Sequence, residues 1–123
     1  MTVILLALAG GVGAAVRFVV DGFVRTRLKT AFPWGTVTIN VSGSLLLGFL
    51  AGLVMRGQAP ESLLLILGTG FLGGYTTFST ASLETIRLVQ SGRTALAIIN
   101  GLGTMTVSVM AAAAGVWISL LLP

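Results

Sequence analysis

Hydrogen-bonding side chains recur at helical spacing in two otherwise apolar stretches of the chain. Every fourth position is small or polar: Thr36, Asn40, Ser44, Gly48 and Gly52 in the first stretch, and Asn100, Thr104, Ser108 and Ala112 in the second. Residues four apart share one face of a helix. Helix packing in membranes alone accounts for either stripe. The asparagines favour a further role, because an amide in hydrocarbon is costly unless it meets a partner or water. Together the stripes suggest the wall of a polar path.

A third group of such residues is the segment GGYTTFSTAS, Gly73–Ser82, in the middle of another apolar stretch. Two glycines followed by threonines weaken a helix there. A broken helix in a membrane frees backbone carbonyl groups, which hold cations in many transporters. Phe78 follows directly, and the positive edge of its ring suits an anion. A simple packing kink is the alternative, and these residues alone do not decide between the two.

The ionisable residues limit the chemistry that such a path supports. The acids Asp21, Glu61 and Glu84 stand at or beyond the ends of the apolar stretches, and the chain has no His or Cys. Proton-coupled transport generally needs a carboxylate or histidine inside the membrane. Hydroxyl and amide donors instead suit a small anion, and Arg17 either attracts it or anchors the helix at the interface. We expect a transport protein and not an enzyme.

The composition predicts an all-α membrane protein. Of 123 residues, 55% are hydrophobic and 8% charged, and the mean hydropathy is +1.06. A membrane-crossing helix needs roughly 20 apolar residues, and four stretches supply them. The net charge of +4 lies mainly between these stretches, which suits lipid headgroups and gives no indication of nucleic-acid binding. Four short helices form too thin a bundle to enclose a path, so we expect an oligomer. The expected spans are residues 2–20, 34–55, 62–83 and 94–122.

Three motifs resemble those of one family. GFLGGYTTFST at Gly70–Thr80 is similar to the signature of the Fluc (CrcB) fluoride channels. GGVGAAVRF at Gly10–Phe18 resembles their first-helix motif, and PWGTVTINVSG at Pro33–Gly43 their second-helix motif. Glu84, after the third motif, also fits. The resemblance covers three of the four spans, in order.

This resemblance implies a passive channel that exports fluoride from a bacterial cytoplasm across the plasma membrane. It implies a dimer of two antiparallel subunits, with a structural Na⁺ held at the third-helix break by the carbonyl groups of Gly73 and Thr76. The family commonly has a second phenylalanine where this chain has Ala81, so the aromatic lining is incomplete. The implied pathway residues are Arg17, Asn40, Phe78, Ser79, Thr80, Thr104 and Ser108.

The distribution of cations bears on the partner. With four spans, both termini lie on one side of the membrane, where Arg56 is the only loop cation. The positive-inside rule then places the first and third loops in the cytoplasm. Such a bias favours pairing with an oppositely oriented homologue over a homodimer. The functional alternatives are a non-conducting membrane subunit and a small proton-coupled exporter. The cations on the loop side are Arg25, Arg27, Lys29, Arg87 and Arg93.

Overall fold

The computed structural model describes residues 1–123 and contains helices as its only regular elements. Four helical units have the length and composition to cross a membrane. The first unit is α1 (Thr2–Arg27) and the second is α2 (Trp34–Met55). The third unit consists of α3 (Glu61–Leu63), the π-helical segment η1 (Leu64–Leu72), α4 (Gly73–Tyr75) and α5 (Ser79–Gln90). The fourth consists of α6 (Thr94–Ile98), the π-helical segment η2 (Ile99–Gly103) and α7 (Thr104–Leu120).

The predicted all-α fold with an interrupted third helix is confirmed. Helix α2 occupies residues 34–55, as expected, whereas α1 continues past residue 20 to Arg27 and the third unit continues past residue 83 to Gln90. These extensions contain charged residues, so hydropathy alone ends the spans earlier than the helices end.

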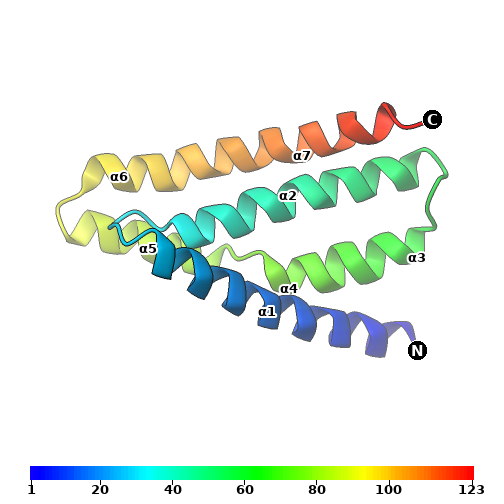
Figure 1. The fold of residues 1–123 in the computed structure, drawn as a ribbon, viewed down its shortest axis with the longest axis horizontal. Coiled ribbons are helices and arrows are strands. Elements are labelled where there is room, and N and C mark those ends of the chain that lie inside the picture. Colours follow the sequence, from blue (N-terminus) through cyan, green and yellow to red (C-terminus); the bar gives the residue numbers. More distant parts are fainter.

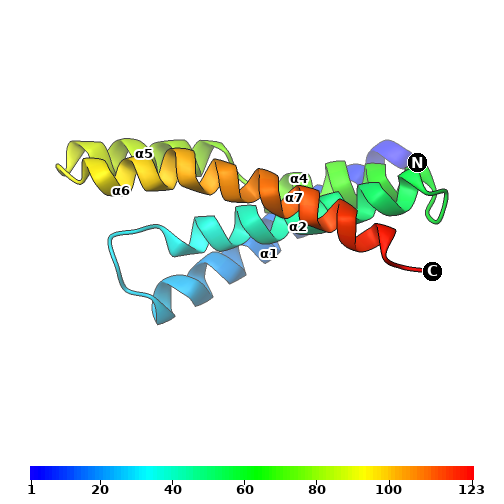
Figure 2. The same cartoon turned by 90° about the horizontal axis from the view of Figure 1, so that it is seen from above.

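The helices lie side by side with α2 between α7 and the third unit (Figure 1). Helix α1 packs against η1 and α4, on the other side of the third unit from α7. Both termini and the α2–α3 loop are at one end of the molecule, and the other two loops are at the opposite end. Seen from above, α5 and α6 lie together on one side, and the α1–α2 loop lies on the other (Figure 2).

Glycines allow α2 and α7 to approach to backbone contact. A β-carbon at Gly48 would overlap the carbonyl group of Ala112, and one at Gly115 would overlap the carbonyl group of Leu45. Gly52 is also buried in this interface. The glycine half of the α2 stripe is therefore a packing surface, as small residues in membrane helices commonly are.

Gly74 of the third unit has the same use, and the helix breaks after the glycine pair rather than at it. Gly73 and Gly74 are helical, and a β-carbon at Gly74 would overlap the backbone of Gly10 in α1. The chain leaves the helix only at Thr76, which is extended (φ −77°, ψ 161°), and returns to it at Ser79. Close contact with α1, rather than helix weakening, accounts for Gly74.

The end of the chain is held by the α2–α3 loop. Arg56 donates from Nη1 to the carbonyl oxygen of Ser119 and from Nη2 to that of Leu122, at 2.9 Å for the second bond. Gln58 Nε2 donates to the carbonyl oxygen of Pro123 at 3.0 Å. The last carbonyl groups of a helix have no partner within it and carry partial negative charge. Arg56 satisfies both needs at the end of α7.

Candidate functional site

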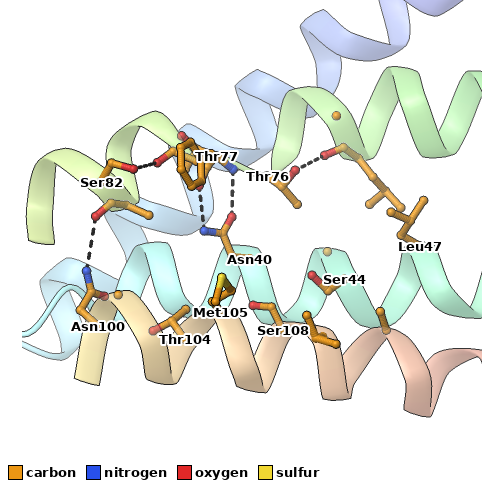
Figure 3. A pocket seen from close by; sticks show the side chains of 18 of the residues that line it. Asn40, Ser44, Leu47, Thr76, Thr77, Ser82, Asn100, Thr104, Met105 and Ser108 are labelled. Carbon is orange, nitrogen blue, oxygen red and sulfur yellow. Dashed lines mark hydrogen bonds between the residues drawn. The ribbon is translucent and has the colours of Figure 1, made fainter. Parts of the chain in front are cut away.

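A groove of about 680 Å³ lies between α2, the third unit and the fourth unit. Asn40 and Ser44 line it from α2, and Thr104 and Ser108 line it from α7 (Figure 3). The two stripes predicted from the sequence thus face one space. Phe78 lines the same groove from the helix break.

Asn40 bonds to the backbone of the break through both the nitrogen and the oxygen of its amide. Its Nδ2 donates to the carbonyl oxygen of Thr77 at 2.8 Å, and its Oδ1 accepts from the Thr77 backbone N–H at 2.9 Å (Figure 3). This pairing replaces the two backbone bonds that the interrupted helix loses at Thr77. We expected Asn40 to offer a free donor to a polar path. It retains one N–H for that purpose and otherwise holds the break in shape.

Tyr75, the last helical residue before the break, bonds to α2. Ser42 Oγ donates to the carbonyl oxygen of Thr38 at 2.6 Å, so its lone pairs accept from the Tyr75 hydroxyl at 3.0 Å. The Tyr75 ring is buried with Ile39 and Leu72. Sequence reasoning did not single out Tyr75 or Ser42, although a tyrosine at the centre of an apolar span needs a partner for its hydroxyl.

Arg17 reaches the break from α1. Its Nη1 lies 3.4 Å from the carbonyl oxygen of Thr76 and donates to it. Both ion pairs of the chain involve Arg25, so Arg17 has no carboxylate partner. Arg17 is therefore an unneutralised cation directed at the backbone of the break, which a simple interface anchor would not be.

The break leaves backbone oxygens without partners. The carbonyl groups of Gly73–Tyr75 accept no hydrogen bond within the chain. Helix α4 ends at Tyr75, the Thr76 N–H donates to the carbonyl oxygen of Leu72, and the Thr77 N–H donates to Asn40. The Thr76 carbonyl oxygen accepts only from Arg17. Four consecutive carbonyl groups are thus available, wholly or in part, to a ligand that prefers oxygen.

The fourth unit presents polar groups in two different states. Thr85 Oγ1 donates its only proton to the carbonyl oxygen of Ala81 at 2.8 Å, so it accepts from Asn100 Nδ2 at 2.8 Å. This fixes the amide of Asn100 towards α5. Asn100 lies in η2 and Ser108 in α7, so a wide π-helical turn interrupts the regular stripe expected from the sequence. Ser108 Oγ is buried and has no partner.

The residues after the break start α5. Phe78 is 86% exposed in the single subunit although it lines the groove. Ser79 is exposed, and its Oγ lies 3.5 Å from Thr77 Oγ1. The backbone N–H of Thr80 donates to Thr77 Oγ1 at 3.2 Å, which caps the start of the helix. Ala81 faces the groove beside Phe78.

Sequence comparison relates this chain to known proteins. Residues 4–116 match the family described as CrcB-like protein, Camphor Resistance (CrcB). The chain belongs to the CrcB family. A member from Leifsonia xyli, named fluoride-specific ion channel FluC 1, is 46% identical over 96% of this chain and 86% of its own length.

Two further CrcB-family members show the same level of similarity. A Mycobacterium tuberculosis protein named fluoride-specific ion channel FluC 2 is 46% identical over 91% of this chain and 86% of its own length. One from Novosphingobium aromaticivorans, named fluoride-specific ion channel FluC, is 49% identical over 85% of this chain and 84% of its own length. The family match over residues 4–116 includes the helix break and both stripes.

This CrcB-family chain also contains a buried carboxylate, which corrects the expectation that it has none. Glu84 is 9% exposed and accepts from Thr36 Oγ1 at 2.5 Å. Arg25 Nη2 lies 3.6 Å from the other Glu84 oxygen, while Arg25 Nε donates to Asp21 at 2.9 Å. Sequence reasoning placed Glu84 at a span end because α5 was expected to stop there. Thr36, the first residue of the α2 stripe, was the signal that could have indicated its partner.

Proposed function

We propose that this chain is a subunit of a fluoride-selective passive channel that exports F⁻ across the bacterial plasma membrane. The observation that carries the proposal is the groove, in which Phe78, the remaining N–H of Asn40 and the unpartnered hydroxyl of Ser108 face one space. An aromatic edge and neutral hydrogen-bond donors attract a small anion. They do not bind it as tightly as a fixed positive charge would, so the anion can also leave. The names of the relatives support fluoride as that anion.

A channel of this kind needs a second subunit to complete the path. The groove of one subunit leaves Phe78 86% exposed, so this lining residue is not enclosed by the subunit's own helices. Burying this face against a second, antiparallel subunit turns two half-lined grooves into closed paths. Ala81 leaves each path of a homodimer without the second aromatic ring expected in the family.

The residues at the break fit a structural Na⁺. Hard cations prefer oxygen ligands, and unwound backbone carbonyl groups bind Na⁺ in transporters. The Gly73 carbonyl oxygen has no hydrogen bond and the Thr76 carbonyl oxygen has one, so both retain lone pairs. No cluster of acidic, His or Cys side chains competes for this role. If bound there, Na⁺ would supply positive charge at the break; Asn40 and Tyr75 shape the carbonyl groups that would hold it.

Efflux from liposomes containing the purified protein tests the channel directly. We expect F⁻ efflux driven by a membrane potential, no comparable Cl⁻ efflux, and an F⁻ rate that persists when the pH is equal on both sides. The buried Glu84 makes a proton-coupled exporter the second candidate, and it predicts efflux that collapses without a pH gradient. The Glu84→Gln variant separates the two candidates further. If the protein is a passive channel, F⁻ efflux by this variant remains independent of the pH gradient. Absence of F⁻ efflux from the wild type, or equal Cl⁻ efflux, contradicts the proposal.

We propose that the partner is a homologue inserted in the opposite orientation. Arg56 is the only Lys or Arg on the side of the termini, and its charge is bound to the carbonyl groups at the end of α7. The opposite end carries five cations, so this chain has one strongly preferred orientation. A partner of opposite orientation also has room to provide the aromatic ring that Ala81 lacks.

Topology reporters on the C-terminus test the orientation in cells. We expect signal only from the reporter that is active outside the cytoplasm, because both termini lie opposite the cationic loops. A variant with Arg87→Gln and Arg93→Gln, which reduces the bias without touching a described contact, serves as the comparison and should give a mixed signal. Equal signals from the wild type, or full fluoride resistance from this chain alone, would favour a homodimer.

A further inference from the structure

We propose that Arg17 sets the Na⁺ affinity of the break by competing with the ion for the Thr76 carbonyl oxygen. The inference rests on the proposed Na⁺ site and extends it to a side chain that does not itself bind the ion. It starts from the Arg17–Thr76 hydrogen bond, which brings a guanidinium to the same oxygen that would bind Na⁺.

Two features of Arg17 make this competition effective. Arg17 has no carboxylate partner, so its full positive charge acts on its surroundings. It is also only partly exposed and contacts a backbone in a membrane-spanning helix, where water screens charge less than at a surface. A cation placed there is repelled by the guanidinium.

Besides repelling bound Na⁺, Arg17 acts on the site when Na⁺ is absent. Of the carbonyl groups of Gly73–Thr76, only that of Thr76 has a partner, and the partner is Arg17. The guanidinium therefore stabilises the state without Na⁺ by satisfying one oxygen of the site. Repulsion in the bound state and stabilisation of the free state lower the Na⁺ affinity in the same direction. Both disappear when the charge is removed.

The role differs from that of the other residues around the break. Asn40 bonds to Thr77 through a neutral amide, and Tyr75 bonds to Ser42, so neither brings charge to the carbonyl groups. Arg17 alone couples the position of α1 to the electrostatics of the site. A site weakened in this way releases Na⁺ more readily than the carbonyl groups by themselves would allow.

Thermal unfolding of the assembled protein over a range of Na⁺ concentrations tests the proposal. N-methyl-D-glucamine keeps the ionic strength constant. For Arg17→Gln, which removes the charge and retains an amide donor, we expect half-maximal stabilisation at about tenfold lower Na⁺ than for the wild type, equivalent to about 1.4 kcal/mol. Arg17→Lys retains the charge and should resemble the wild type. Arg87→Gln, on an exposed residue of α5, controls for the loss of an arginine.

Each outcome decides something. An unchanged or higher midpoint for Arg17→Gln, with a Na⁺-dependent wild type, overturns the role of Arg17 and leaves the Na⁺ site standing. A wild type whose unfolding ignores Na⁺ overturns both, while fluoride efflux remains a separate measurement. If Arg17→Gln does not assemble, the side-chain ¹⁵N signals of Arg17 in the wild type provide the readout. They should shift along a Na⁺ titration, and constant signals contradict the proposal.

Discussion

Phe78→Ile lowers the fluoride efflux by about 100-fold, which corresponds to about 2.8 kcal/mol of lost anion stabilisation. Isoleucine keeps an apolar side chain at the groove but has no aromatic ring, so the positive edge that meets the anion is lost. Because Phe78 is 86% exposed in the single subunit, its loss creates no cavity in the fold of the subunit. The measurement is F⁻ efflux from liposomes, with the oligomeric state checked by size-exclusion chromatography.

Phe18→Ile is the matched control. Phe18 is also a phenylalanine and is 81% exposed, so its substitution changes the same chemistry at a similarly exposed position. It lies on α1 and does not line the groove. Its efflux should remain close to that of the wild type. Equal efflux from Phe78→Ile and the wild type would show that the ring does not contact the anion. Loss of assembly in Phe78→Ile, with Phe18→Ile intact, would instead make Phe78 an interface residue and contradict its pathway role.

Gly48→Val separates α2 from α7 and destabilises the subunit by about 3 kcal/mol or more, the upper range for an overpacked interior. The β-carbon of the new residue would overlap the backbone of Ala112, which unlike a side chain has no alternative rotamer. Relief therefore requires the two helices to move apart along an interface that also contains Gly52 and Gly115. Thermal or denaturant unfolding in detergent measures the effect.

The control for this substitution is Gly11→Val in α1. No atom lies within 4 Å of a β-carbon built at Gly11, so the extra side chain extends away from the neighbouring helices. We expect its unfolding temperature to stay near that of the wild type. If Gly48→Val unfolds at the wild-type temperature, the close α2–α7 contact is absent from the assembled protein. Fluoride efflux should fall in Gly48→Val together with stability, since Asn40 and Ser44 occupy the same helix.

Much of the architecture followed from hydropathy and spacing. Four apolar stretches with few charges predict four membrane-spanning helices, because the hydrocarbon requires backbone groups to be satisfied within each segment. The period of four residues in the stripes predicted that Asn40 and Ser44 would face the same space as Thr104 and Ser108, and they do. Local patterns determine these features, since helix geometry converts sequence spacing directly into a face.

The roles of individual residues depended on contacts between segments far apart in the chain. Gly73 and Gly74 predict a weak helix by propensity, but the approach of α1 to Gly74 keeps that turn helical, and the break falls at Thr76. The pathway role predicted for Asn40 stays a prediction, and the fold adds a second role, because its amide also bonds to the Thr77 backbone at the break. Spacing within one helix cannot reveal which backbone group lies opposite.

For the same reason, the sequence alone did not show the environments of two charged residues, Glu84 and Arg17. Glu84 appeared to end a span, and only the packing of α5 against α2 shows it buried on Thr36. Arg17 had two equally suitable roles until the fold placed Thr76 within reach of its guanidinium. The sequence by itself determined which residues are polar and which helix faces they occupy. The tertiary structure decided their partners, because a hydrogen bond or ion pair in a membrane depends on distance across helices and not on separation along the chain.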